Sequence, residues 1–300
     1  MIYGFERPLF GDIALRIHLV VGDRYAVMID TGMLGFEDMV KQALDFLNQQ
    51  GVPLAFIVNT HAHHDHIGLN GWVQAQTAAR VIGHAWGRRW TEDPDTNYQE
   101  FVLAFPDIIA DSQALREEVR DTMGIPAPVD MGVTGREHFY PGGFDVELIE
   151  LSGHVLGEVG LLVAEDKTLI TGDVLIGLNL PMFHGYVDPE QFRKSLGTIR
   201  DLVTAGRVTR LRSAHLPELH DPAEIMEHVA QREQAVRNIE SLILDIARGD
   251  ALSLKEIWLR TSDASGKRPE FRGLAMVAGH LRQQCRGGRM EVQRDRYRTL

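Results

Sequence analysis

Residues 60–68 hold the densest group of metal-capable side chains in the chain. Four histidines and one carboxylate fall within six residues: His61, His63, His64, Asp65 and His66. They directly follow the apolar run 54–58, which is typical of a buried strand. Buried imidazoles and carboxylates cost free energy unless they find partners, and a metal ion is the usual partner for such a mixture. The spacing therefore indicates a metal site at the exit of a buried strand.

Three later strands each end in one isolated metal-capable residue. We expect these strands over residues 146–151, 168–171 and 208–213, followed by His154, Asp173 and His215. Loops at strand ends are where protein scaffolds place functional side chains. Together with the histidine segment they supply seven candidate ligands: His61, His63, Asp65, His66, His154, Asp173 and His215. All seven are nitrogen or oxygen donors, which suits Zn²⁺, iron or Mn²⁺ rather than a thiolate site.

The elements that must position these residues follow an alternating β and α pattern. Two β-rich runs, 15–21 and 25–29, predict a hairpin whose second strand ends at Asp30-Thr31-Gly32. Apolar residues then recur with the helical period over residues 36–50. The remaining expected elements are a strand over 54–59, a helix over 70–79, a strand over 80–83, a strand pair at 160–164 and 168–171, and a helix over 189–205.

Two segments depart from this pattern. Residues 84–135 are rich in aromatic side chains and are divided by prolines, which predicts a helical insertion that serves as a lid or as a dimer contact. After His215 a long helix is expected from Asp221-Pro222, since aspartate is a good N-cap and proline a good first helical residue. Two shorter helices and a Gly-led hairpin follow. We therefore predict a catalytic domain over residues 1–221 and a winged-helix-like helical domain over residues 222–300.

Composition limits the class of protein. The 300 residues carry a net charge of -11, which argues against a surface devoted to nucleic acid, although residues 260–300 have ten Arg or Lys against four Asp or Glu. The single cysteine, Cys285, excludes an internal disulfide and fits a reducing compartment. No signal peptide pattern and no apolar run of membrane-spanning length is seen. We expect a cytoplasmic protein without a membrane partner.

The motifs resemble those of the metallo-β-lactamase fold superfamily, whose first motif is His-x-His-x-Asp-His. Here that motif is His61-Ala62-His63-His64-Asp65-His66, and the later motifs match Ser-Gly-His154, Thr-Gly-Asp173 and Ser-Ala-His215. Asp30-Thr31-Gly32 matches the superfamily's early turn, so the resemblance covers roughly residues 12–220 in the right order. The resemblance implies an α/β fold, a four-layer αββα sandwich. Val155 and the sequence Ala214-His215-Leu216 depart from the family's usual residues, which affects the loops around the substrate and removes no ligand.

The resemblance also implies roles for the candidate residues. His61, His63 and His154 would hold one divalent metal ion, Asp65, His66 and His215 a second, and Asp173 would bridge both. Zinc is the metal that this donor set favours, with iron or manganese as alternatives. Asp65 and Asp173 are the catalytic candidates, because a carboxylate orients the attacking hydroxide and helps to move protons. Asp30 is expected behind the histidine loop, where it fixes the ligands.

The chemistry that this resemblance implies is hydrolysis of a small ester, thioester or lactone. His184 and Tyr186 follow Asp173 in a segment that borders the active site in related enzymes, so both are candidates for contact with a small-molecule substrate. Three alternatives stay open: an endoribonuclease of the β-lactamase-like type, a signal-binding protein with residual hydrolase activity, and an iron-dependent sulfur dioxygenase. A homodimer formed through residues 84–135 is also compatible with the sequence.

Overall fold

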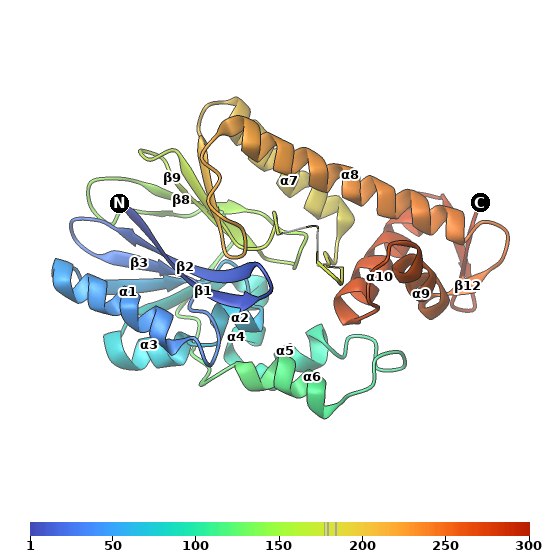
Figure 1. The fold of residues 1–300 in the computed structure, drawn as a ribbon, viewed down its shortest axis with the longest axis horizontal. Helices are drawn as coiled ribbons and strands as arrows, with labels where there is room; N and C mark the ends of the chain where they lie inside the picture. The colour runs from blue at the N-terminus through green and yellow to red at the C-terminus, as the bar shows by residue number, and fades with distance from the viewer. Residues whose placement is uncertain (177, 179, 184) are drawn as a thin grey trace.

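Two sheets packed face to face form the centre of the protein (Figure 1). The computed structural model describes residues 1–176, 178, 180–183 and 185–300. The first sheet contains six strands in chain order: β1 (Ile2–Phe10), β2 (Ile13–Val21), β3 (Ala26–Ile29), β4 (Leu54–Val58), β5 (Arg80–His84) and β6 (Met131–Val133). The second contains five strands in the order β11 (Arg210–Ser213), β10 (Thr168–Thr171), β9 (Val159–Val163), β8 (Val146–Glu150) and β7 (His138–Phe139).

Successive side chains along each strand point to opposite faces of the sheet, and this alternation creates the layers. In β3, Val27 and Ile29 pack into the core between the sheets, whereas Ala26 and Met28 pack on the outer face against helices. The helices α1 (Glu37–Gln50) and α3 (Asn70–Thr77) cover this outer face. The other sheet repeats the arrangement, because Ile170 of β10 points to the shared core and Leu169 to the opposite cluster. That cluster is completed by α7 (Pro189–Thr204) and α8 (Pro222–Ile246). The four-layer αββα sandwich predicted from the sequence is confirmed.

Strand direction brings the candidate ligands to one edge. β3 and β4 are parallel, so Asp30 and the histidine loop leave the first sheet on the same side. β10 and β11 are parallel, and β9 is antiparallel to both β10 and β8, so β8 runs in the same direction as β10. His154, Asp173 and His215 therefore leave the second sheet together.

Two strands of the first sheet were not anticipated. β1 pairs with β2 in antiparallel register along its length, as in Phe5 opposite Ile17. β6 lies at the end of the stretch expected to be wholly helical and pairs in parallel with β5, as in Ile82 opposite Met131. The rest of that stretch contains the 3-10 helices η1 (Ala85–Gly87) and η2 (Arg120–Thr122) and the helices α4 (Arg88–Glu92), α5 (Pro94–Phe101) and α6 (Gln113–Glu118). A three-residue strand carries too short a pattern to be recognised against its aromatic surroundings.

The C-terminal elements are joined to the sandwich by α8. Asp221 caps this helix by accepting a hydrogen bond from the backbone N–H of Ala223 at 2.6 Å. α8 packs against α7 and continues to the C-terminal helices, as Figure 1 shows. The order of elements there is β12 (Leu252–Ser253), α9 (Leu254–Ala264), α10 (Phe271–Arg286), β13 (Met290–Gln293) and β14 (Arg296–Thr299). The helices and small sheet follow the order expected of a winged-helix-like unit, while the domain boundary at residue 221 stays a prediction. Among the helices of the described residues, none combines the length and apolar character needed to cross a bilayer.

Candidate metal centre

All seven candidate ligands meet between the two sheets. β4 ends at Val58, and the chain then passes His61 and His63 before a single helical turn, α2 (His64–Ile67), begins. The loops after β8, β10 and β11 bring the partners from the second sheet. Ligand atoms of three groups lie within 4.8 Å of one another: His61 with His63 and His154, His61 with His66 and Asp173, and Asp65 with His66 and His215.

The first of these groups is formed by three imidazole nitrogens. Nδ1 of His63 lies 2.9 Å from Nε2 of His61 and 3.0 Å from Nε2 of His154. In the third group, Nε2 of His215 lies 3.1 Å from Oδ2 of Asp65. These two sets correspond to the two metal positions that the sequence predicts.

Asp173 lies between the two sets and directs one oxygen to each. Its Oδ2 is 3.7 Å from Nε2 of His154, on the side of the three imidazoles. Its Oδ1 is 3.5 Å from Nε2 of His66 and 3.6 Å from Nε2 of His215. This is the placement required of a carboxylate that bridges two cations.

Hydrogen bonds behind the imidazoles determine which nitrogens face the centre. Nδ1 of His154 lies 2.9 Å from the carbonyl oxygen of Gly185, and Nδ1 of His215 lies 3.3 Å from that of Ala14. A carbonyl oxygen only accepts, so in both rings Nδ1 carries the proton and Nε2 offers its lone pair to the centre. Metal-binding histidines characteristically have such an acceptor on the opposite nitrogen.

Asp30 supports the histidine loop from the neighbouring strand end. Its Oδ1 accepts from the backbone N–H of Thr60 at 2.7 Å, and its Oδ2 accepts from the Thr60 hydroxyl at 2.8 Å. Oδ2 also lies 2.8 Å from Nδ1 of His66. Asp30 has a φ of 60°, a left-handed conformation that non-glycine residues rarely adopt. It therefore lies behind the ligands, where the sequence places it.

Burial and neighbouring charges shift the pKa values of the residues in the centre. Burial, followed by the charge of His66, lowers the pKa of His61 well below its ordinary value, and burial also lowers the pKa of His63 and His154. Burial disfavours the carboxylate form of Asp65, but the nearby imidazoles of His66 and His64 outweigh it and hold the pKa of Asp65 well below its ordinary value. The three imidazoles are therefore neutral near pH 7, and Asp65 is ionised.

A divalent metal ion fits this donor set. Nε2 of His66 is buried and has no hydrogen-bond partner among the described residues. In the first set, three neutral imidazole nitrogens converge within about hydrogen-bond distance, where a cation satisfies all three lone pairs at once. The residues present thus match the hard and borderline ligands that divalent ions take in proteins.

Glu158 also contributes to the centre, although the sequence did not single it out. The side chain is fully buried, and Oε1 accepts from the backbone N–H groups of Asp173 at 2.7 Å and Val174 at 3.0 Å. Burial and the charge of Asp173 raise the pKa of Glu158 to about 8. Position 172, next to Asp173, requires glycine because a Cβ there would lie 2.6 Å from Oγ1 of Thr60. The sequence feature that could have identified Glu158 is its position as an acidic residue immediately before the apolar strand 159–163.

The centre opens into a cavity of about 220 Å³. Phe101 forms part of its wall and stacks on the ring of His63 with a centroid distance of 4.1 Å. Phe101 also meets Phe271 of α10 edge to face at 5.1 Å, so residues 84–135 and the C-terminal helices enclose the cavity together. Its polar lining includes His64, Glu118 and Arg272. Arg272 lies 4.3 Å above the Phe271 ring and donates to Glu270 at 2.7 Å.

The two residues predicted to contact substrate have different outcomes. Tyr186 is not among the residues that line this cavity and lies against a neighbouring one. Its ring stacks on Phe192 at 4.7 Å, and its hydroxyl is hydrogen-bonded to Nε2 of His280 at 2.8 Å. His184 lies outside the described residues. Contact of either residue with a substrate stays a prediction.

Comparison with known proteins agrees with this geometry. A family model described as "Metallo-beta-lactamase superfamily" matches residues 16–215. Proteins named hydroxyacylglutathione hydrolase are similar in Methylococcus capsulatus (26% identical over 166 residues, 55% of this chain and 50% of the relative) and in Bdellovibrio bacteriovorus (28% over 196 residues, 65% and 61%). The chain thus spans only about half to three fifths of the length of these relatives.

Solved structures extend the similarity of fold to the whole chain. A metallo-beta-lactamase family protein from Thermus thermophilus superposes with a TM-score of 0.78 at 18% identity, covering 100% of this chain and 98% of the other. A beta-lactamase domain protein from Burkholderia ambifaria gives 0.70 at 16% identity, covering 100% and 91%. At these identities the likeness concerns the fold alone. The family model covers both the histidine motif and His215, and the chain belongs to the metallo-beta-lactamase superfamily.

Proposed function

We propose that the protein is a metal-dependent hydrolase of small carboxylic thioesters, with esters and lactones as related substrates. The observation that carries the proposal is the position of Asp173, which directs one oxygen toward each of two ligand sets. Such an arrangement suits two divalent ions, and zinc is the metal that nitrogen and carboxylate donors favour. The choice of a thioester is supported by the two relatives named hydroxyacylglutathione hydrolase.

His61, His63 and His154 would hold one ion, Asp65, His66 and His215 the other, and Asp173 both. Bound divalent ions supply Lewis-acid polarisation of the carbonyl group and lower the pKa of a water molecule. The chain itself orients that water. The Asp65 side chain is 15% exposed and that of Asp173 only 4%, so Asp65 is the more accessible carboxylate from the cavity. We assign to Asp65 the acceptance of the water proton.

The reaction then balances as follows. The water oxygen adds to the carbonyl carbon as one water proton passes to Asp65, the carbon–sulfur bond breaks, and the proton on Asp65 passes to the thiolate, which leaves as a thiol beside the carboxylic acid product. Burial opposes ionisation of Asp65, but the neighbouring imidazoles hold its pKa well below the ordinary value, so it is a carboxylate before the reaction and gives up an accepted proton readily. Arg272 and His64 line the same cavity and offer hydrogen-bond donors or charge to the polar part of a substrate.

RNA cleavage is the second candidate, because a protein named beta-lactamase-like protein 2 homolog from Drosophila melanogaster is 26% identical over 221 residues, 70% of this chain and 62% of that relative. Two features favour the small substrate. The cavity measures only about 220 Å³, and the net charge of the chain is -11, which repels a polyanion.

The test is turnover by metal-loaded protein of matched thioesters, esters, lactones and single-stranded RNA. We expect thioesters to give the highest kcat/KM and Asp173→Asn to lower it at least 100-fold with loss of bound metal. Asp166→Asn is the matched control, since that side chain is 43% exposed and far along the strand from the centre. Failure to hydrolyse any carbonyl substrate, or an Asp173→Asn protein as active as wild type, contradicts the proposal. Salt-sensitive cleavage of RNA in place of ester turnover would favour the second candidate.

A further inference from the structure

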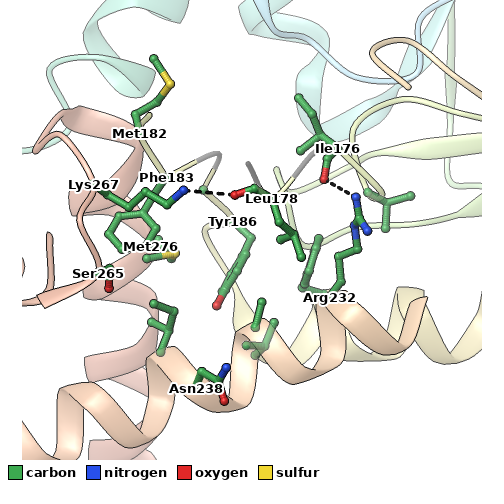
Figure 2. A pocket seen from close by; sticks show the side chains of 16 residues that line it. Ile176, Leu178, Met182, Phe183, Tyr186, Arg232, Asn238, Ser265, Lys267 and Met276 are labelled. Carbon is green, nitrogen blue, oxygen red and sulfur yellow. Dashed lines mark hydrogen bonds between the residues drawn. The ribbon is translucent and has the colours of Figure 1, made fainter. Parts of the chain in front are cut away.

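A second cavity of about 230 Å³ lies beside the one at the metal centre, and Figure 2 shows side chains that line this second cavity. Its walls come from three distant parts of the chain: the segment after Asp173, the middle of α8, and the region of α10 with the loop before it. Aliphatic, aromatic and thioether side chains dominate the lining, including Ile176, Phe183, Val236, Ile239 and Met276. A concave, mainly apolar space of this kind is typical of a ligand site.

The two cavities adjoin each other. Ile176 and Met182 line both, so they form the wall that the cavities share. The methionine side chain is unbranched and adopts several conformations readily. A ligand can therefore displace the Met182 side chain where it separates the two cavities. Each cavity alone is smaller than the about 300–1,000 Å³ usual for ligand sites, whereas the two together fall within that range. An elongated molecule could therefore reach from the metal centre into the second cavity.

The charged groups beside the second cavity are engaged by the main chain. Nη2 of Arg232 donates to the carbonyl oxygens of Leu175 at 2.9 Å and Ile176 at 2.8 Å. Nζ of Lys267 donates to the carbonyl oxygen of Leu178 at 3.1 Å, and the bonds from Arg232 to Ile176 and from Lys267 to Leu178 are visible in Figure 2. The Tyr186 hydroxyl is hydrogen-bonded to His280. These polar atoms already have partners, whereas Nε of Arg232 is buried without one among the described residues, so the cavity presents a mainly apolar surface to an occupant.

We propose that this second cavity binds the apolar acyl chain of the substrate. The inference rests on the proposed thioester hydrolase function and specifies its substrate class: thioesters of unbranched medium-chain acids. The carbonyl group lies at the metal centre, the acyl chain passes Ile176 and Met182, and the polar thiol lies toward His64, Glu118 and Arg272. Each methylene group buried in the cavity then tightens binding roughly fourfold.

Two series of measurements on the full-length, metal-loaded protein test this assignment. In the first, kcat/KM is measured for thioesters of one thiol with acetyl, butanoyl, hexanoyl, octanoyl and decanoyl groups. In the second, the Kd of the free carboxylates of the same lengths is measured by calorimetry, which does not depend on turnover. Both are expected to improve with chain length until the cavity is filled.

The variant Ala235→Phe fills the second cavity from α8 and should remove the dependence of kcat/KM and Kd on acyl-chain length. We expect at least a tenfold loss for octanoyl and decanoyl substrates, with acetyl turnover unchanged, since Ala235 lines only the second cavity. Ala230→Phe is the matched control, because Ala230 is exposed on the same helix. Ile239→Trp fills the cavity from the next turn and replaces Ala235→Phe if that protein does not fold.

The outcomes separate the two proposals. Turnover of thioesters without any dependence on chain length, or an unaltered dependence in both filled variants, overturns the acyl site and leaves the hydrolase function standing. Absence of turnover for every thioester contradicts the hydrolase function and the acyl assignment with it. A chain-length dependence that both filled variants abolish and Ala230→Phe preserves supports the acyl site.

Discussion

Oδ2 of Asp30 lies 2.8 Å from Nδ1 of His66, at the C-terminal end of a strand adjacent to the one that carries the histidines. An ionised carboxylate has no proton to donate, so Nδ1 of His66 is the donor in this contact. The other ring nitrogen, Nε2, is directed at Asp173. Asp30 also accepts two hydrogen bonds from Thr60, so it fixes both the ring and the backbone of the loop. Asp30 therefore fixes the orientation of the His66 ring, with Nε2 toward Asp173.

Replacing Asp30 by Asn should weaken metal binding. Asparagine tolerates the left-handed backbone found here, but its amide has a single acceptor oxygen, so it cannot accept from both the Thr60 backbone N–H and the His66 ring as the carboxylate does. Loss of such a supporting partner usually costs about 10- to 100-fold in metal affinity. Competition with a chromophoric chelator measures the change, and Asp45→Asn on the exposed face of α1 is the control. Equal metal affinity of the Asp30 variant and wild type would contradict the role given to this carboxylate.

Glu158 should tolerate glutamine better than alanine. Alanine leaves the backbone N–H groups of Asp173 and Val174 without their acceptor, which should cost about 2–6 kcal/mol at about 1–3 kcal/mol per buried group. Glutamine keeps an acceptor oxygen, and burial raises the pKa of Glu158 to about 8, so a neutral amide replaces a carboxyl group that is mainly neutral near pH 7. Urea denaturation and metal content compare the two variants. Equal damage from both substitutions would show that the charge, and not the acceptor, matters.

Arg232 should stabilise the segment that follows Asp173. Its guanidinium extends from α8 to the carbonyl oxygens of Leu175 and Ile176, and its pKa is lowered to about 10 by burial. Arg232→Met keeps the apolar stem and removes both hydrogen bonds, so we expect the free energy of unfolding to fall by about 2–4 kcal/mol. Arg237→Met is the control on the exposed side of α8, where the guanidinium bonds to Gln234. If the two variants lose the same stability, the contact with residues 175 and 176 does not contribute.

His280 should make the protein less stable in mild acid. Burial, followed by the charge of Arg193, lowers its pKa from 6.5 to about 3. Between pH 6.5 and pH 3 the unfolded chain binds a proton at His280 and the folded protein does not. The contribution of neutral His280 to the free energy of unfolding is therefore complete above about pH 6.5 and is lost as the pH falls toward 3. At pH 5 the loss amounts to about 2 kcal/mol, at about 1.36 kcal/mol per pKa unit.

His280→Gln retains a partner for the Tyr186 hydroxyl and removes the titration. Urea denaturation at pH 7 and pH 5 should therefore show a smaller acid-induced loss of stability in this variant than in wild type. His220→Gln is the control, since the His220 side chain is 71% exposed. An unchanged difference between the two pH values in His280→Gln would rule out this source of acid sensitivity.

The local sequence predicted the individual strands and the set of candidate ligands, and the resemblance of the motifs to the metallo-β-lactamase superfamily implied the sandwich. Strand runs such as 54–58 and 168–171 have strong apolar patterns, and each ends in a polar residue that a buried strand cannot hold without a partner. His61, Asp173 and their partners could be grouped from the sequence because each follows a strand end and matches a family motif, and the observed parallel pairings bring these ends to one edge. The resemblance led us to expect Asp30 behind the histidine loop, and its carboxylate contacts Thr60 and His66 there.

Tertiary structure decided everything that depends on contacts between distant segments. Whether Tyr186 faces the metal centre or the neighbouring cavity is set by its stacking on Phe192 and its bond to His280, 94 residues away. The short strand β6 exists because β5 offers an edge for pairing, and its three residues carry no readable period. The apolar cavity requires α8 and α10 to approach the segment after Asp173. The sequence by itself therefore determined the candidate ligands of the centre, because they lie at strand ends, and packing decided the shape of the space beside it.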